Sequence, residues 1–175
     1  MFFSPKSICS LLLFSLPAVQ AASTDATWLA DAARLQEQQL GARIGVAVVD
    51  TASGDTTSYR GDERFPLNST FKTLLCGALL SQVDKGELAL SATTQFPASA
   101  LVAYSPVTEQ WVAPASASWQ QLCGAAIGYS DNTAANLVAE KVGGPAAITN
   151  FVAALGDSVT RVDRYEPELN SAIPG

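Results

Sequence analysis

The stretch Ser69-Thr70-Phe71-Lys72 opens a long apolar run, which reads TLLCGALL over residues 73–80. Leucine and alanine dominate this run and apolar residues occupy every face of it, which predicts a buried helix. Pro66 disfavours helical geometry in the residue before it, so we expect the helix to begin near Ser69. The pair Lys85-Gly86 is a typical C-terminal signal and predicts the end of the helix.

Ser69 and Lys72 are three residues apart, so a helix places them on one face, one turn from each other. A serine is a weak nucleophile until a neighbouring base takes its proton, and a desolvated lysine can be that base. The pair therefore indicates nucleophilic chemistry. A second interpretation stays open on this tetrapeptide alone, in which Ser69 only caps the helix and Lys72 reaches solvent.

The composition limits the chemistry that the chain can perform. It has 175 residues, 48% of them hydrophobic, and a formal net charge of −6. One domain or a pair of small lobes fits this length, and the negative charge argues against nucleic acid or an anionic membrane as a partner. The sequence contains no histidine, which excludes a Ser-His-Asp triad and a His-ligated metal. Catalysis must then use Lys, Glu, Asp, Ser or Tyr.

Residues 1–21 have the pattern of a secretory signal peptide. Lys6 supplies a positive charge, residues 8–16 form an apolar stretch too short to span a bilayer, and small residues precede the expected cleavage after Ala21. A core helix is the alternative for this segment. Cleavage would export the protein and leave no membrane attachment.

Two cysteines remain once that segment is removed, because Cys9 lies within it and Cys76 and Cys123 do not. In an exported protein two cysteines are expected to be joined. Closing a loop of roughly 47 residues stabilises a fold by roughly 4 kcal/mol in the chain-entropy treatment. The alternative is a pair of buried free thiols.

The remaining pattern predicts a helix, a hairpin and then a run of helices. Residues 27–40 are amphipathic and end at Gly41, and residues 43–50 and 56–60 are two strands joined by a turn. We find no convincing strand beyond Gly61. Three further helices are expected, from the Ser118 cap through Ile127, over 132–142, and over 146–155. From Arg161 onward we expect a structured loop.

Three further stretches carry polar residues with catalytic potential. They are Ser130-Asp131-Asn132 between two helices, Arg164 to Asn170 in the late loop, and Tyr104-Ser105-Pro106-Val107 between the two cysteines. Each has an ordinary interpretation alone, as a helix cap, a solvated loop and a turn. Together with the Ser69–Lys72 pair, at these separations, they resemble the class A serine β-lactamases. The resemblance extends from about Leu29 to Gly175.

The resemblance implies a set of catalytic roles. Ser69 would be the nucleophile that forms an acyl-enzyme with the lactam ring, and Lys72 would activate it alone or through a water. Ser130 would pass a proton to the leaving ring nitrogen. Glu166 would activate the water that releases the acyl group, since an acyl-serine turns over only when a base is directed at water.

The resemblance also implies substrate-binding and structural roles. Asn132 would hold the acylamide of the substrate, Asn170 would help to hold the water, and Tyr104 would form an aromatic wall at the entrance. Cys76 and Cys123 match a disulfide found in part of the family. No metal or organic cofactor is implied, and the expected partner is a small β-lactam bound by a monomer in the periplasm.

The implied fold is α+β with two lobes and the site between them. We expect residues 1–21 to be the signal, 22–60 the first part of an α/β lobe, and 61–175 an all-helical lobe with its late loop cut short. The family continues into a K-T-G strand that residues 1–175 do not contain. That strand would supply an oxyanion donor, whose loss typically costs about 100- to 1,000-fold in rate.

Two alternatives to a β-lactamase stay open. A penicillin-binding D-Ala-D-Ala peptidase shares the serine and lysine chemistry but lacks a base directed at water, so Glu166 with Asn170 argues against it. A non-catalytic truncated product is the other, and we expect a chain limited to these 175 residues to be inactive.

Overall fold

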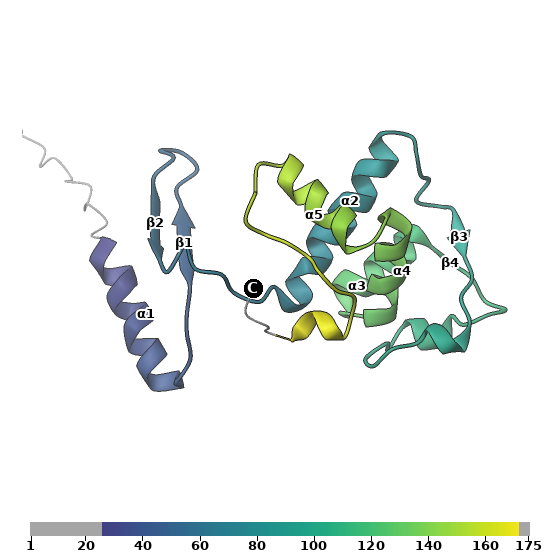
Figure 1. Ribbon diagram of the computed structural model, residues 1–175, viewed down its shortest axis with the longest axis horizontal. Helices are drawn as coiled ribbons and strands as arrows, with labels where there is room; N and C mark the ends of the chain where they lie inside the picture. The colour runs from purple at the N-terminus through teal and green to yellow at the C-terminus, as the bar shows by residue number, and fades with distance from the viewer. Residues whose placement is uncertain (1–25, 172–175) are drawn as a thin grey trace, which may run out of the picture. The chain divides into compact units, whose positions relative to one another are not determined.

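The computed structural model describes residues 26–171, so the predicted signal segment 1–21 lies outside the described residues. The chain forms two compact units that divide between Arg64 and Phe65. The sequence had suggested a division between residues 60 and 61. The first unit is a helix with a hairpin and the second is mainly helical (Figure 1), so the predicted α+β class is confirmed.

The first unit consists of α1 (Ala26–Leu40), β1 (Val46–Val49) and β2 (Thr56–Tyr59). The strands pair antiparallel, with Val46 opposite Tyr59 and Val49 opposite Thr56. The helix and hairpin predicted from the sequence are therefore present, although both strands are shorter than expected. Helix α1 packs against β2, which gives the hairpin the covering helix that an isolated pair of strands needs.

Glu37 joins the end of α1 to the hairpin. Its carboxylate accepts hydrogen bonds from the Ile44 backbone N–H at 2.8 Å, from the Tyr59 hydroxyl at 2.9 Å and from Arg60 Nε at 2.9 Å. The Ile44 N–H and then the Arg60 guanidinium lower the pKa of Glu37 from 4.5 to about 2. Donors that bond the charged form favour it, so this carboxylate stays ionised as it holds the three segments together.

The second unit is built from four α-helices and several short elements. In chain order they are η1 (Asn68–Thr70), α2 (Phe71–Asp84), β3 (Thr93–Thr94), η2 (Ala98–Ala100), η3 (Thr108–Gln110), β4 (Ala117–Ser118), α3 (Trp119–Gly128), α4 (Asn132–Val142), α5 (Pro145–Ala154) and η4 (Glu168–Asn170). Strands β3 and β4 pair antiparallel. The expectation of no strand beyond Gly61 was therefore wrong, because a strand of two residues has no period to detect.

Local sequence signals set the helix ends. Ser118 and Gln121 form a capping box before α3, in which Ser118 Oγ accepts from the Gln121 N–H at 3.2 Å and Gln121 Oε1 accepts from the Ser118 N–H at 2.9 Å. Gly143 ends α4 in the left-handed conformation, with a φ of +108°. At the start of α2 the helix begins near Ser69 as predicted, after a 3₁₀ turn over Asn68–Thr70, and the alternative in which Ser69 caps it is wrong. Ser69 lies in this turn, and the helix itself begins at Phe71.

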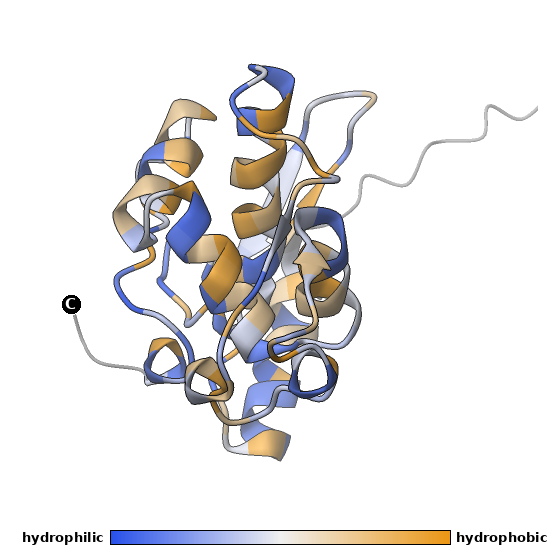
Figure 2. Ribbon diagram, turned by 90° about the vertical axis from the view of Figure 1, so that its right-hand side faces the viewer, coloured by the Kyte–Doolittle hydropathy of each residue, from blue (hydrophilic) through white to orange (hydrophobic). Residues whose placement is uncertain are grey.

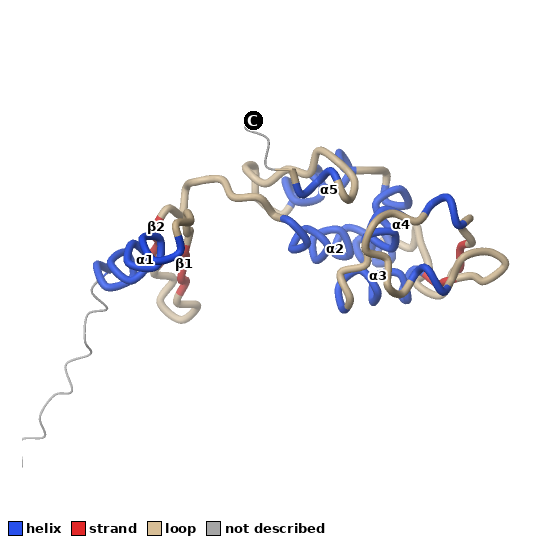
Figure 3. Tube along the Cα trace, turned by 90° about the horizontal axis from the view of Figure 1, so that it is seen from below, coloured by secondary structure: helices blue, strands red, loops and turns tan. Residues whose placement is uncertain are grey.

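Helix α2 lies at the centre of the second unit and packs against α3, α4 and α5 (Figures 1 and 3). Gly77 lets α5 approach closely, because a Cβ at this position would lie 3.2 Å from the Phe151 ring. Much of the helical ribbon has the colour of hydrophobic residues in Figure 2. Full burial of a side chain such as Leu75 contributes about 1.5–3 kcal/mol. Leu80 is 46% exposed, so the prediction that every face of this helix is buried was too broad.

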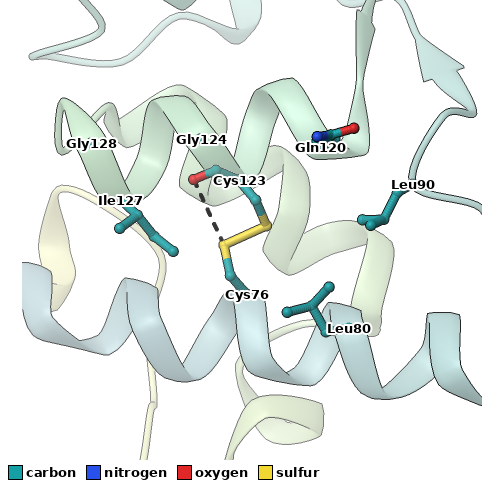
Figure 4. A pocket seen from close by; sticks show the side chains of 8 residues that line it. All are labelled: Cys76, Leu80, Leu90, Gln120, Cys123, Gly124, Ile127 and Gly128. Atoms are coloured by element: carbon teal, nitrogen blue, oxygen red, sulfur yellow. Dashed lines mark hydrogen bonds between the residues drawn. A yellow bond between two sulfur atoms is a disulfide. The ribbon is translucent and has the colours of Figure 1, made fainter.

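A disulfide joins Cys76 of α2 to Cys123 of α3, with the two Cα atoms 5.8 Å apart (Figure 4). The predicted pairing is confirmed. An apolar hollow of about 380 Å³ opens beside it. Its lining consists of Cys76, Leu80, Leu90, Gln120, Cys123, Gly124, Ile127 and Gly128. None of these belongs to the polar residues singled out from the sequence.

Over residues 26–171, the structure holds no helix long and apolar enough to cross a membrane.

Candidate active site

Lys72 connects three of the residues singled out from the sequence. It lies in the first turn of α2 and is 1% exposed. Its Nζ donates to Ser69 Oγ at 3.2 Å, to Ser130 Oγ at 3.1 Å and to Asn132 Oδ1 at 2.7 Å. A fourth contact, at 2.8 Å, is made to the backbone oxygen of Ser130. The interpretation in which Lys72 reaches solvent is therefore wrong.

Ser69 and Ser130 bring their hydroxyl groups into contact. Ser130 Oγ donates to Ser69 Oγ at 2.7 Å, so the Ser69 oxygen accepts from both Ser130 and Lys72. Ser130 lies in the turn between α3 and α4 with a φ of +58°. This left-handed conformation is uncommon for a residue with a side chain and often marks a functional site. Here both oxygens of Ser130 bond the same lysine nitrogen.

Glu166 completes the buried part of the site. Its Oε1 lies 3.2 Å from Lys72 Nζ, and both side chains are fully buried. Lys72 therefore has five oxygen neighbours, whereas an amine nitrogen carries at most three protons. Within residues 26–171, Glu166 Oε1 has no hydrogen-bond donor directed at it. A buried oxygen without a donor is rare and is the place to look for a water or a substrate group.

Two asparagines hold Glu166 in place. Asn170 Nδ2 donates to Glu166 Oε2 at 2.6 Å, which orients the carboxylate. The side-chain amide of Asn136 makes two hydrogen bonds to the backbone of Glu166. Its Nδ2 donates to the Glu166 carbonyl and its Oδ1 accepts from the Glu166 N–H, each at 2.9 Å. Sequence reasoning missed Asn136. Its spacing of four residues from Asn132 in the same helix was a usable signal, since i and i+4 share a face.

Asn132 has a fixed amide orientation. Its Nδ2 donates to the Ala103 carbonyl at 2.8 Å while its Oδ1 accepts from Lys72. The backbone N–H of Asn132 donates to the Tyr104 carbonyl at 3.0 Å, which places Tyr104 beside the site. The Tyr104 side chain is 66% exposed and its φ is +63°. The structure thus brings together all seven predicted site residues, Ser69, Lys72, Tyr104, Ser130, Asn132, Glu166 and Asn170. Tyr104 contacts the others through its backbone carbonyl, which bonds the Asn132 N–H.

Asp131 is a second residue that sequence reasoning left without a role. Its carboxylate is completely buried and accepts four hydrogen bonds, from Val107 N–H at 3.0 Å, Thr108 N–H at 2.9 Å, Thr108 Oγ1 at 2.8 Å and Ala134 N–H at 2.8 Å. It caps α4 and anchors the loop that carries Tyr104. Asp131 therefore positions the start of α4 relative to this loop. Across residues 26–171 there is no cluster of His, Cys, Asp and Glu suited to hold a metal ion.

The comparisons with known proteins agree with this geometry. The profile described as the β-lactamase enzyme family matches residues 29–173. β-Lactamase AER-1 of Aeromonas hydrophila is 46% identical over 151 residues, which make up 86% of this chain and 50% of that protein.

Solved structures extend the comparison to the fold. An ancestral (GNCA) class A β-lactamase aligns with a TM-score of 0.80 at 52% identity, over 84% of this chain and 56% of that chain. The chromosome-encoded β-lactamase of Vibrio parahaemolyticus aligns with a TM-score of 0.79 at 48% identity, over 84% and 56%. This chain spans about half the length of these relatives. By sequence and by fold, the chain belongs to the β-lactamase enzyme family, and within it to class A.

Proposed function

We propose that the protein hydrolyses β-lactams, penicillins among them, through an acyl-enzyme on Ser69. The observation that carries the proposal is the contact of Ser69 Oγ with both Lys72 Nζ and Ser130 Oγ, in one network with a buried Glu166. A hydroxyl placed against a potential base and a second hydroxyl is the arrangement that nucleophilic catalysis requires.

In the acylation step, Ser69 Oγ attacks the carbonyl carbon of the lactam and the ring C–N bond breaks. The proton of Ser69 leaves by one of two routes, directly to Lys72 in its unprotonated amine form or through a water to Glu166. Ser130 Oγ gives its proton to the ring nitrogen, and Lys72, 3.1 Å from Ser130 Oγ, is placed to replace that proton. The product is an ester on Ser69 with an amine in place of the ring amide.

In the deacylation step, a water attacks the ester carbonyl while Glu166 takes one of its protons. Glu166 Oε1 supports this role, because it lies near Lys72 Nζ without a hydrogen bond and can accept one from a water. Asn170 holds the opposite oxygen, Oε2, so the carboxylate presents a defined face. Glu166 returns this proton to the Ser69 oxygen as the ester C–O bond breaks, and the open-ring acid departs.

Substrate contacts follow from the groups at the rim. One proton of Asn132 Nδ2 bonds Ala103, and the second is available for an acylamide carbonyl of the substrate. Tyr104 provides an exposed aromatic surface beside it. Glu166 paired with Asn170 argues against a D-Ala-D-Ala peptidase as the alternative, since those enzymes are expected to lack a carboxylate directed at water.

We further propose that the protein acts in the periplasm as a monomer and confers resistance to β-lactam antibiotics. A polypeptide limited to residues 22–175 is expected to be inactive. In the structure β1 exposes Val48 and Val49, by 50% and 58%, and among residues 26–171 its sheet has two strands. An exposed apolar edge of this kind favours aggregation over function.

The test is growth on ampicillin. Cells would express three chains: the full-length protein, meaning the product of the whole coding region that contains these residues, its Ser69→Ala variant, and residues 22–175 behind an export signal. Resistance is expected from the first alone. Equal sensitivity of cells with the full-length protein and with Ser69→Ala would refute the proposed function. Resistance from residues 22–175 that Ser69→Ala abolishes would refute the expected inactivity.

A further inference from the structure

Two hydroxyl groups outside the proposed chemistry form a closed hydrogen-bonded ring beside Asn132. Ser105 Oγ and Thr133 Oγ1 lie 2.7 Å apart, with Ser105 8% exposed and Thr133 completely buried. Both also bond Val102, because the Val102 N–H donates to Thr133 Oγ1 at 2.9 Å and Ser105 Oγ donates to the Val102 carbonyl at 2.8 Å. Every member of the ring is therefore satisfied.

The ring has one consistent direction for its protons. A serine hydroxyl has a single proton, and that of Ser105 is used on the Val102 carbonyl. The bond between the two hydroxyls must then be donated by Thr133 Oγ1 and accepted by Ser105 Oγ. Ser105 Oγ also accepts from the Thr133 backbone N–H, at 3.3 Å. Removing either hydroxyl would leave buried polar groups without partners, which costs more than the bond itself contributes.

The ring ties residues 102–105 to the first turn of α4, and this segment is the one that orients Asn132. The Ala103 carbonyl within it accepts from Asn132 Nδ2 at 2.8 Å, and the Tyr104 carbonyl accepts from the Asn132 N–H at 3.0 Å. With Nδ2 held by Ala103, the Oδ1 atom faces Lys72. The direction of the remaining Nδ2 proton is thus set by the position of Ala103.

We propose that Ser105 and Thr133 are positioning residues that fix the amide of Asn132, and through it the preference for lactams that carry an acylamide side chain. The proposal rests on the proposed function, because it deepens the role given to Asn132 there. Lactams without the acylamide make no use of the second Nδ2 proton. Their reaction with Ser69 should therefore be nearly independent of the ring.

Three variants of the full-length protein separate positioning from general loss of structure. Thr133→Val removes the hydroxyl and keeps the branched shape, whereas Thr133→Ser keeps the hydroxyl. Thr149→Val is the matched control, because Thr149 Oγ1 also accepts a backbone N–H, at 2.9 Å, and donates to a carbonyl, at 3.1 Å, both of Val162 in another part of the unit. Circular dichroism reports folding, and Ser105→Ala replaces Thr133→Val if that variant does not fold.

The kinetic measurement is the rate of acylation of Ser69 by benzylpenicillin, divided by the rate with the same ring system bearing a free amine in place of the acylamide. This ratio should fall roughly tenfold in Thr133→Val, as expected for a lost directional hydrogen bond. Thr133→Ser and Thr149→Val should keep it. A folded Thr133→Val variant with an unchanged ratio would overturn the proposal.

A second measurement keeps the two proposals distinguishable. The side-chain amide signals of Asn132, observed by NMR in ¹⁵N-asparagine-labelled protein, should shift in Thr133→Val and stay in place in Thr149→Val. If neither lactam acylates the unmodified protein, the proposed function fails. The NMR signals alone then test whether the ring positions the Asn132 amide. Asn132 signals that do not move in Thr133→Val would overturn that positioning role.

Discussion

Lys72 Nζ lies 3.2 Å from Glu166 Oε1, yet that oxygen is the buried side-chain atom in residues 26–171 that lacks a hydrogen bond. The lysine protons are outnumbered because Ser69, Ser130 and Asn132 compete for them. The two atoms therefore lie close together without a directed hydrogen bond between them. A carboxylate oxygen in this state is ready to bond a water, which is the role proposed for it.

Glu166→Ala should separate the two chemical steps. In the full-length variant Ser69 should still acquire a penicillin adduct, while release of the adduct slows by about 100- to 10,000-fold, the usual contribution of a general base. Intact-protein mass spectrometry after exposure to penicillin measures both steps. Ser69→Ala is the control that should show no adduct. Rapid loss of the adduct from Glu166→Ala would mean that another group activates the water.

Asn136→Ala should damage turnover through the backbone of Glu166. The substitution removes both hydrogen bonds that fix this backbone. We expect a loss of about 1–3 kcal/mol in the free energy of unfolding, and a fall of up to about 100-fold in kcat from displacement of the base. Urea unfolding and steady-state kinetics measure the two effects. Asn150→Ala, at an exposed position of α5, should change neither. Unaltered kcat in Asn136→Ala would show that Glu166 is positioned by other contacts.

Replacement of both Cys76 and Cys123 by alanine should lower the free energy of unfolding. The bridge closes a loop with a sequence separation of 47, which corresponds to roughly 4 kcal/mol in the chain-entropy treatment. The measurement is the urea midpoint under oxidising conditions, and addition of a reductant to the unmodified protein should reproduce the loss. A change below about 1 kcal/mol would indicate that the unfolded chain is already compact between these positions.

The pKa of Glu37 should be close to 2 in the folded protein. Because it is lowered from 4.5, the ionised form contributes stability that is complete above about pH 4.5 and is lost as the pH falls through about 2. Carboxyl ¹³C shifts followed by NMR measure the midpoint. Arg60→Gln should move it upward toward 4.5, and Asp31→Asn, which removes an exposed ion pair with Arg34, should not. A midpoint near 4.5 in the unmodified protein would contradict the bonded geometry.

The sequence alone determined most of the local structure. The helix at 27–40, the hairpin, the Ser118 cap and the helix at 132–142 were all predictable, because caps, glycines and periodic apolar residues act over a few positions. Cys76 and Cys123 could be paired because no other cysteine remained once Cys9 was assigned to the signal segment. The motif residues also identified the family before any geometry was available.

Only the tertiary structure decided how these residues meet. Lys72 bonds Ser130 and Asn132 across 58 and 60 positions of sequence, and no local pattern encodes such a distance. Asn136 and Thr133 have ordinary helical neighbours in the sequence, and their partners, Glu166 and Ser105, come from other segments. The physical reason is packing: α2, α3 and α4 bury their apolar faces against one another, and this places their polar ends in a single network.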